Sequence, residues 1–254
     1  MLFFCFSIIS IQSKIIQCSM KKKSYHIISN IVIALVLVSL FMFTTNISSN
    51  YVFSYSNPEV IYNGNEDSNK VSLMINIYWG NEYIEPMLDV LDEYGVKTTF
   101  FVGGSWASKY PDMLKEIVSR GHEIGNHGYY HKDQDKLSYD QNYTEIYMCH
   151  QVVKNLTNID MTLFAPPSGA FNKSTLEASN NLGYQTIMWS LDTIDWRDKD
   201  DSLIFTRATQ KVKGGSLILC HPTEHTLKAL PKILSYYQNN GFKAVSVSEN
   251  LKID

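Results

Sequence analysis

Residues 97–131 read KTTFFVGGSWASKYPDMLKEIVSRGHEIGNHGYYH, a stretch in which apolar runs are separated by glycine and proline. The run at 97–104 ends in two glycines and predicts a buried strand that leads into a turn. Pro111 opens a stretch up to Arg120 that predicts a helix, because proline is favoured in the first helical turn. HEIGNH at 122–127 predicts a second short strand followed by a loop. A strand–helix–strand unit of this kind is typical of a parallel sheet.

The same alternation continues on both sides of this stretch. Upstream, the sequence predicts a strand at 71–77 and a helix at 84–95 that Gly95 ends. Downstream, it predicts helices at 138–158, 173–182, 202–211 and 224–238, and strands at 161–166, 186–191, 216–221 and 243–249. Strand and helix alternating about seven times predict an α/β fold with a parallel sheet. Periodicity alone does not separate an open sheet from a closed barrel.

The N-terminal region predicts the compartment. Three lysines, Lys21 to Lys23, precede an apolar run from about Ile27 to Phe43, which is typical of a secretory signal or an uncleaved membrane anchor. No small-residue cleavage site follows, so we favour an anchor with the remaining chain outside the membrane; secretion after signal cleavage is the alternative. Met20 offers a second start, in which case residues 1–19 do not belong to the protein.

The chain therefore divides into a signal or anchor (1–45), a linker rich in Asn, Ser and Tyr (46–67) and a single domain (68–254). The net charge of −3 argues against a nucleic-acid-binding protein, which usually carries a basic footprint. Two cysteines, Cys149 and Cys220, fall within the domain. They do not make a disulfide framework, and we expect both to be free and buried.

Two histidines in the opening stretch suggest a metal site. His127 and His131 are four residues apart, so one turn of helix or one tight loop can direct both imidazoles at a single ion. The spacing alone is weak evidence, because surface histidines also fall four residues apart by chance. His122, in the same segment, is expected to be structural. The assignment of these two histidines as metal ligands therefore depends on the sequence around them.

Four segments carry that wider pattern. They are GHEIGNHG (121–128), APPSG (165–169), WSLDTIDW (189–196) and LILCH (217–221). In this order they resemble the polysaccharide deacetylases of the NodB-homology family, which remove N- or O-acetyl groups from sugars. The resemblance covers about residues 68–250. It implies a distorted, incompletely closed (β/α) barrel whose site lies at the carboxyl ends of the strands.

The resemblance also implies roles for individual residues. In the family, one aspartate and two histidines bind a metal that polarises the acetyl carbonyl and activates water, a second aspartate is the base and a third histidine is the acid. His127 and His131 match the metal histidines. His221 matches the acid, with Asp195 as the carboxylate that orients it and Asp192 in support. The alternative for the two aspartates is that they cap the helix that follows.

A substrate-binding set follows from the same resemblance. Trp196 and Leu219 are expected to wall a small apolar pocket for the acetyl methyl group, with Pro166, Tyr78 and Trp79 beside them. The alternative for Trp196 is ordinary core packing. The expected ligand is an N-acetylated polysaccharide, either peptidoglycan-like or chitin-like.

The first motif departs from the family. The family pattern is Thr-Phe-Asp-Asp-Gly, and one branch instead has Thr-Phe-Asp-Ile-Ser-Trp-Gly. Aligned on that branch, Asn76 stands at the base position and Ile77 at the metal-ligand position; aligned on the shorter pattern, Tyr78 and Trp79 stand there. In either alignment no carboxylate lies between residues 71 and 81. Asparagine cannot act as a base, although its carbonyl oxygen can bind a metal weakly.

A second departure accompanies the first. Ala165 stands where the family has an arginine that pairs with the base carboxylate. Loss of both partners is physically consistent, because a guanidinium beside an amide would be a poorly compensated charge. Glu82 and Glu224 follow strand ends and are the remaining candidates for a base. Zinc is the metal expected at a mainly imidazole site, held weakly or not at all by two histidines alone.

Two functions therefore stay open. The first is a membrane-anchored, metal-dependent hydrolase that removes acetyl groups from an N-acetylated cell-envelope glycan. The alternative is a catalytically impaired family member that binds such a glycan. The histidines at 127, 131 and 221 and the DTIDW segment favour the first, and the missing aspartates favour the second.

Overall fold

The computed structural model describes residues 30–39, 42 and 59–252, and the chain divides into two units, Met1–Tyr55 and Ser56–Asp254. In the first unit, residues 30–39 are helical and their side chains are exposed. No helix among the described residues is long and apolar enough to span a membrane. Both ends of the apolar run predicted as an anchor, and the predicted linker up to residue 58, lie outside the described residues.

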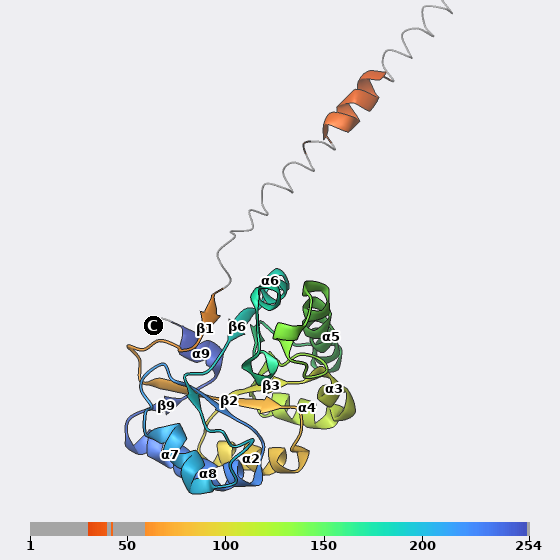
Figure 1. Ribbon diagram of the computed structural model, residues 1–254. Helices are drawn as coiled ribbons and strands as arrows, with labels where there is room; N and C mark the ends of the chain where they lie inside the picture. Colours follow the sequence, from red (N-terminus) through yellow and green to blue (C-terminus); the bar gives the residue numbers. More distant parts are fainter. Residues whose placement is uncertain (1–29, 40–41, 43–58, 253–254) are drawn as a thin grey trace, which may run out of the picture. The chain divides into compact units, whose positions relative to one another are not determined.

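The second unit is built on a parallel sheet of nine strands, in which the long strand β2 (Lys70–Ile77) pairs with β3 (Thr99–Val102) and β8 (Leu217–Cys220). The other strands are β1 (Val60–Ile61), β4 (Glu123–Asn126), β5 (Leu163–Phe164), β6 (Gln185–Ile187), β7 (Leu191–Asp192) and β9 (Lys243–Ala244). The order is β1-β6-β5-β4-β3-β2-β8-β7, and β9 pairs with the start of β2. Since β1 and β7 end this path, the sheet curls without closing, which confirms the predicted open barrel (Figure 1).

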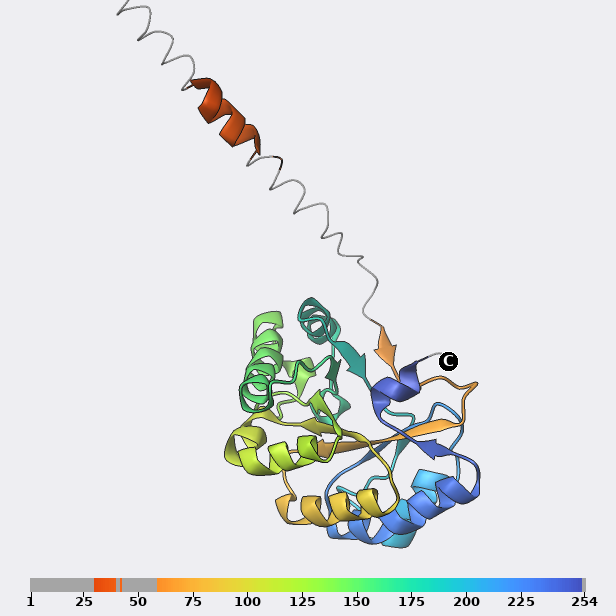
Figure 2. The same ribbon diagram turned by 180° about the vertical axis from the view of Figure 1, so that it is seen from behind.

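Helices surround the curled sheet in both views of the ribbon (Figures 1 and 2). They are α2 (Asn81–Glu93), α3 (Gly104–Lys109), α4 (Pro111–Ser119), α5 (Tyr139–Thr157), α6 (Lys173–Asn181), α7 (Asp201–Thr209), α8 (Glu224–Asn239) and α9 (Val247–Leu251), with short 3-10 turns η1 (Gln134–Lys136) and η2 (Pro167–Gly169). The predicted helices match α2, α4, α5, α6, α7 and α8. The sequence reading missed α3 and α9.

Strand β2 separates the two sides of the core. Its residues are buried from Val71 to Ile77. Because side chains alternate along a strand, Leu73, Ile75 and Ile77 lie on one face and pack in the larger hydrophobic cluster. Met74 lies on the opposite face, in the smaller cluster. Asn76 shares the face of Met74, which is the inner side of the curled sheet.

The structure corrects three predicted elements. The closing strand expected at 243–249 is limited to β9, because the Ser246 side chain accepts a hydrogen bond from the Glu249 backbone N–H (3.3 Å) and starts α9. The strand expected at 186–191 is divided between β6 and β7. In the predicted linker, β1 pairs with β6, so the domain begins before residue 68.

The two cysteines of the domain behave as predicted. Cys149 and Cys220 are free and buried, and burial raises the pKa of both thiols. His122 is structural, as predicted: its Nδ1 accepts a hydrogen bond from the Thr98 backbone N–H (3.2 Å), and its ring packs edge-on against Phe100. These residues therefore stabilise the core.

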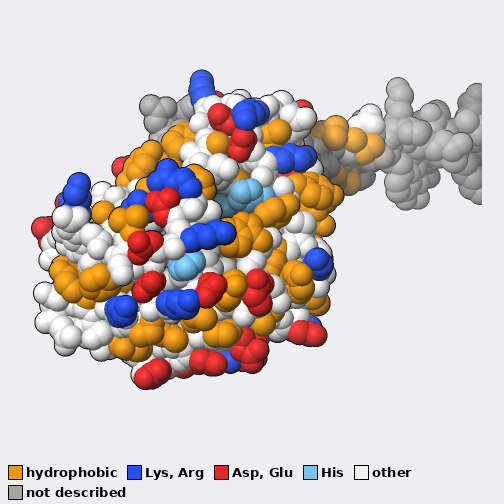
Figure 3. Space-filling view, turned by 60° about the horizontal axis from the view of Figure 1, so that its bottom comes forward, with side chains coloured by type: hydrophobic (Ala, Val, Ile, Leu, Met, Phe, Trp, Pro, Cys, Tyr) orange, Lys and Arg blue, Asp and Glu red, His pale blue; other side chains and the backbone are white. Residues whose placement is uncertain are grey.

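One face of the molecule shows how its charges are distributed. In Figure 3, acidic and basic side chains are interspersed with apolar ones and do not gather by sign. Histidine side chains reach the surface between them. This face offers no extended patch of positive charge to a polyanion.

Substitution of Gly125 tests the packing on the inner side of the curled sheet. Phe101 pairs with Gly125 across β3 and β4, and a Cβ on Gly125 would lie 2.4 Å from the Phe101 ring. We expect Gly125→Ala to lower the free energy of unfolding by about 1–3 kcal/mol in urea titrations, as overpacking typically does. Phe101→Ala removes the ring atoms that would clash, so the free energy of unfolding of the double variant should fall by less than the sum of the two single losses. Additive losses would contradict this account.

Candidate functional site

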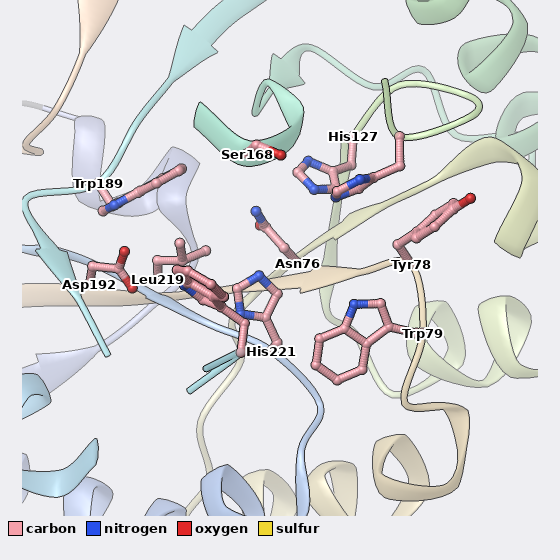
Figure 4. A pocket seen from close by; sticks show the side chains of 11 residues that line it. Asn76, Tyr78, Trp79, His127, Ser168, Trp189, Asp192, Leu219 and His221 are labelled. Carbon is pink, nitrogen blue, oxygen red and sulfur yellow. The ribbon is translucent and has the colours of Figure 1, made fainter. Parts of the chain in front are cut away.

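A cavity of about 520 Å³ opens at the carboxyl ends of the strands (Figure 4). Nine of its lining residues were predicted from the sequence: Asn76, Tyr78, Trp79, His127, His131, Asp192, Trp196, Leu219 and His221. Ser168 and Trp189 complete the lining. The predicted residues, which are scattered over about 150 positions of the chain, are thus brought to one place.

Parallel strands explain this convergence. Asn76 lies at the end of β2, His127 directly after β4, Asp192 at the end of β7 and His221 directly after β8. Ser168 lies in η2, just beyond β5. Since the carboxyl ends of parallel strands meet at one rim, each strand delivers a side chain to the same cavity.

His127 is held as a neutral imidazole. It is 1% exposed, and its Nδ1 lies 2.7 Å from the Ala165 carbonyl oxygen. A carbonyl only accepts, so Nδ1 carries the proton and the lone pair of Nε2 is left free. Burial, followed by the neighbouring His131, lowers the pKa of His127 to about 3. The residue therefore presents an unprotonated nitrogen, as a metal ligand or hydrogen-bond acceptor requires.

His131 faces the same cavity from a strained backbone position. Its φ is 55°, in the left-handed region, and its ring centroid lies 5.0 Å from that of His127. The Tyr78 ring stacks on it at 4.6 Å. Burial lowers the pKa of His131 as well. The first motif thus contributes an aromatic cover to one of the two predicted ligands.

A buried glutamate fixes the loop that carries His131. The Glu145 carboxylate on α5 accepts hydrogen bonds from the backbone N–H groups of Tyr129 (3.0 Å) and Tyr130 (2.7 Å). Lys132 pairs with the second carboxylate oxygen at 3.1 Å. Glu145 is only 5% exposed, so these donors compensate its burial. The geometry of the histidine pair therefore depends on α5 as well as on β4.

His221 and Asp195 form a hydrogen-bonded pair in which the carboxylate is buried. The His221 Nδ1 donates to Asp195 Oδ1 (2.7 Å), and the His221 backbone N–H donates to Oδ2 (2.6 Å). The Thr226 hydroxyl also donates to Oδ2 (2.5 Å), and the Asp195 side chain is 0% exposed. Trp79 stacks on the His221 ring with centroids 5.8 Å apart. This is the arrangement predicted for an oriented acid.

The turn between the two aspartates is strained. Ile194 has a φ of 55°, a position that costs a β-branched residue about 1–3 kcal/mol. It is held by a hydrogen bond from its backbone N–H to Asp192 Oδ1 (2.8 Å) and by the Asp198 N–H on its carbonyl (3.0 Å). The turn leaves Asp192 in the cavity lining and places Asp195 behind His221. Neither caps α7, whose first turn is capped by Asp200.

The first motif brings no carboxylate to the cavity. Asn76 is 3% exposed, and its Oδ1 is buried without a hydrogen-bond partner in the part of the chain that the structure describes. Ile77 lies on the other face of β2, within the larger core cluster. Glu82 and Glu224 do not line the cavity, and Glu224 pairs with Lys228 at 2.5 Å. Neither glutamate replaces the missing base.

Asp192 is the acidic residue that lines the cavity. Burial raises the pKa of its carboxyl group. Asp192 pairs with Leu219 across β7 and β8, and in Figure 4 it lies apart from His127, on the other side of His221. It therefore does not take the place of the carboxylates missing from the first motif.

The remaining predicted residues divide into two groups. Trp196 is 56% exposed and lines the cavity, so the core-packing alternative was wrong. Pro166 is buried and lies outside the cavity lining. The two lining residues that sequence reasoning missed, Ser168 and Trp189, both stand inside the quoted motifs. The positive φ of Ser168 (57°), which turns η2 toward the cavity, could not be read from residue type.

The comparisons with known proteins agree with this geometry. The family model described as "Polysaccharide deacetylase" matches residues 63–187. A peptidoglycan-N-acetylglucosamine deacetylase of Bacillus cereus is 30% identical over 176 residues, which cover 67% of this chain and 82% of that protein. The chain belongs to the polysaccharide deacetylase family.

Three further proteins resemble this chain. The uncharacterized protein YlxY of Bacillus subtilis is 37% identical over 192 residues, covering 76% of this chain but only 60% of that protein. The crystal structure of a CE4 family pseudoenzyme from Bacillus anthracis is 34% identical, with a TM-score of 0.76, covering 78% of this chain and 70% of that chain. A mutant of that pseudoenzyme, described as having restored enzymatic activity, is similar to the same degree (32% identity, TM-score 0.76, 78% and 72% coverage).

A polysaccharide deacetylase requires a metal, and the residues present do not fit one well. Catalytic zinc sites use three protein ligands. Here the cavity offers two imidazoles, and the amide of Asn76 is the third polar group beside them. Among the described residues, no group of three or more His, Cys, Asp or Glu side chains is placed to hold an ion. The unpaired Asn76 Oδ1 is a weak third donor at best. We therefore assign no chemical step to a metal in this protein.

Burial of the histidines predicts a pH-dependent stability. Because folding lowers the pKa of His127 from 6.5 to about 3, its stabilising contribution is complete above pH 6.5 and is lost as the pH falls toward 3. Between pH 7 and pH 5, we expect the free energy of unfolding of His127→Gln to fall by about 2 kcal/mol less than that of wild type in urea titrations. Burial also lowers the pKa of His122, to about 4, so the free energy of unfolding of His122→Gln should likewise fall less than that of wild type as the pH is lowered. An unchanged pH dependence in either variant would contradict its assigned burial.

Proposed function

We propose that this protein binds an N-acetylated glycan of the cell envelope and that its deacetylase centre is catalytically impaired. One observation carries the proposal: at the position where the family has its base, the inner face of β2 presents Asn76. An amide cannot take a proton from water at neutral pH. The similarity to a CE4 family pseudoenzyme supports the same conclusion.

The cavity keeps the properties of a sugar site. Three tryptophans line it, Trp79, Trp189 and Trp196, and their faces offer the apolar contact on which sugar rings stack. Asp192 and the neutral His127 supply polar groups among them. A mostly apolar cavity with a few placed polar groups is the usual form of a small-ligand site. Binding therefore does not depend on the residues that the first motif has lost.

The named relatives favour peptidoglycan over chitin as the source of the glycan. One of them is the peptidoglycan-N-acetylglucosamine deacetylase of Bacillus cereus, and another is the peptidoglycan-N-acetylmuramic acid deacetylase PdaA of Bacillus subtilis. The lysines before the apolar N-terminal run support a location at the outer side of the membrane, where this polymer lies. We propose peptidoglycan as the ligand and a membrane-anchored, extracytoplasmic location.

A second candidate function is the deacetylase itself, which would hydrolyse the amide bond of the N-acetyl group. The pair of His221 and Asp195 favours it, because the imidazole is oriented as an acid for the leaving group would be. Without a base, the rate would fall by about 10² to 10⁴. The candidate is therefore a slow hydrolase, unless another group takes the proton.

Trp196→Ala tests glycan binding. We expect the variant to keep the stability of wild type, because the side chain is 56% exposed, and to bind purified peptidoglycan about tenfold more weakly in co-sedimentation, which corresponds to ~1.4 kcal/mol. Tyr147→Ala, which removes an exposed aromatic ring from α5, is the matched control and should bind as wild type does. Wild-type protein that remains in the supernatant would overturn the proposed function.

Asn76→Asp tests the cause of the impairment. The new carboxylate would stand at the base position and face the same cavity as His127 and His131, where its charge favours a cation, so we expect zinc affinity to rise at least about tenfold in equilibrium titrations. Acetate release from peptidoglycan should exceed that of wild type and should disappear when His221→Ala is added. Asn155→Asp, on the exposed face of α5, controls for the added charge. Measurable acetate release by wild type that Asn76→Asp does not exceed, and that His221→Ala abolishes, would instead establish the second candidate.

A further inference from the structure

Asn76 brings an unused hydrogen-bond donor to the candidate site. Its side chain lines the cavity, and Figure 4 shows the amide directed into it. The Asn76 oxygen is buried without a partner, whereas the amide nitrogen is not among the buried unpaired atoms and makes no hydrogen bond to a described residue. The nitrogen is therefore accessible from the cavity and free to donate.

The register of the sheet places an apolar neighbour next to this donor. Leu219 on β8 pairs with Met74 on β2, and both precede Asn76 by one inward-facing position. Leu219 is 3% exposed and lines the cavity. A small ligand that accepts a hydrogen bond from Asn76 would therefore have an apolar surface beside it, as a methyl group requires.

The same register places an acceptor on the other side of the donor. Strand β3 lies between β2 and β4, and His127 follows β4 two residues past the position level with Asn76. Two strand spacings separate the backbones of β2 and β4 by about 10 Å. The side chains of Asn76 and His127 thus reach the cavity from different strands, with room between them for a small planar group.

His127 supplies the complementary chemistry. Its Nδ1 donates to the Ala165 carbonyl, so the lone pair of Nε2 is left for the cavity that the ring lines. A secondary amide carries a carbonyl acceptor and an N–H donor that point in opposite directions, and so it matches one donor and one acceptor on separate strands. An ester lacks the N–H, and an ammonium group lacks the carbonyl.

We propose that Asn76 is a specificity-determining residue that donates a hydrogen bond to the carbonyl oxygen of the bound N-acetyl group, while the N–H of that group donates to His127. The proposal rests on the proposed function, because it takes binding of the acetylated glycan as given. It adds which residues recognise the acetyl group, and it gives the substituted first motif a function in binding. The protein would then distinguish an N-acetyl group from a free amine or a hydroxyl at the same sugar carbon.

Calorimetry on the full-length protein in EDTA tests the donor. The probes are β-1,4-linked tetrasaccharides of N-acetylglucosamine, glucosamine and glucose, which differ only in the substituent at C2. We expect wild type to bind the acetylated probe at least about tenfold more tightly than the glucose probe, as one well-placed hydrogen bond would allow. Asn76→Ala should reduce this ratio to about threefold or less, because the donor is lost.

Asn76→Asp reverses the chemistry at this position. It replaces the donor by a negatively charged acceptor, so it should bind the acetylated probe more weakly than Asn76→Ala does. At about pH 6, where the amino groups of glucosamine are protonated, it should bind the glucosamine probe at least about tenfold more tightly than wild type does. Asn155→Ala and Asn155→Asp, on the exposed face of α5, are the matched controls and should keep the wild-type affinities.

A spectroscopic measurement on wild type tests the acceptor and needs no variant to fold. Long-range ¹H–¹⁵N spectra report each ring nitrogen of a histidine separately. We expect the His127 Nε2 resonance to move when the acetylated probe binds, because it accepts the amide N–H, while Nδ1 keeps its proton. An Nε2 resonance that stays in place on binding would overturn the role of His127.

The outcomes separate this proposal from the proposed function. Equal affinities of wild type for the acetylated and glucose probes, or a wild-type ratio in both Asn76 variants, would overturn the role of Asn76 while glycan binding stands. Failure of the acetylated probe to bind wild type that still co-sediments with peptidoglycan would do the same. Failure of wild type to bind both the probe and peptidoglycan would overturn the proposed function, and the role of Asn76 with it.

Discussion

The alternation of side chains along β2 constrains both the core and the site. Ile75 and Ile77 must face the helices, because they pack in the larger cluster. Asn76 must therefore face the inner side of the sheet, and a one-residue shift in register would exchange these positions. Parallel pairing with β3 and β8 fixes that register. A polar residue thus reaches the cavity at position 76, and Ile77 cannot serve as a ligand there.

The retained motifs also stabilise the fold, so their presence is weak evidence for catalysis. Asp195 is fully buried and accepts three hydrogen bonds, from the His221 ring, the His221 backbone and Thr226. Removing one partner would leave a buried carboxylate less well compensated, which is costly. His127 likewise joins β4 to the chain after β5 through the Ala165 carbonyl. A protein without a base would still be expected to keep both contacts.

The sequence predicted those parts of the site that sit at strand ends. Asn76, His127 and His221 could be placed because each directly follows or ends an apolar run. Short elements were harder to predict: two-residue strands such as β1 have no periodicity, and their position is set by pairing partners distant in the chain. Trp189 was missed for a related reason, since it lies between β6 and β7, in a segment that reads as one continuous strand. The left-handed positions of Ser168 and Ile194 are imposed by tertiary contacts and have no signal in residue type.

Burial of the cavity's side chains determines whether a charged or an uncharged ligand is favoured there. Burial lowers the pKa of His127 and His131 and raises that of Asp192, so it disfavours positive and negative charge alike. A deacetylated sugar carries an ammonium group, which would lose its hydration in such a cavity and find no carboxylate on the first motif to compensate it. An N-acetyl group is uncharged and avoids that cost. Under the proposed function, the absence of the first-motif aspartates therefore removes a base and, at the same time, makes the cavity better suited to the acetylated sugar than to its deacetylated product.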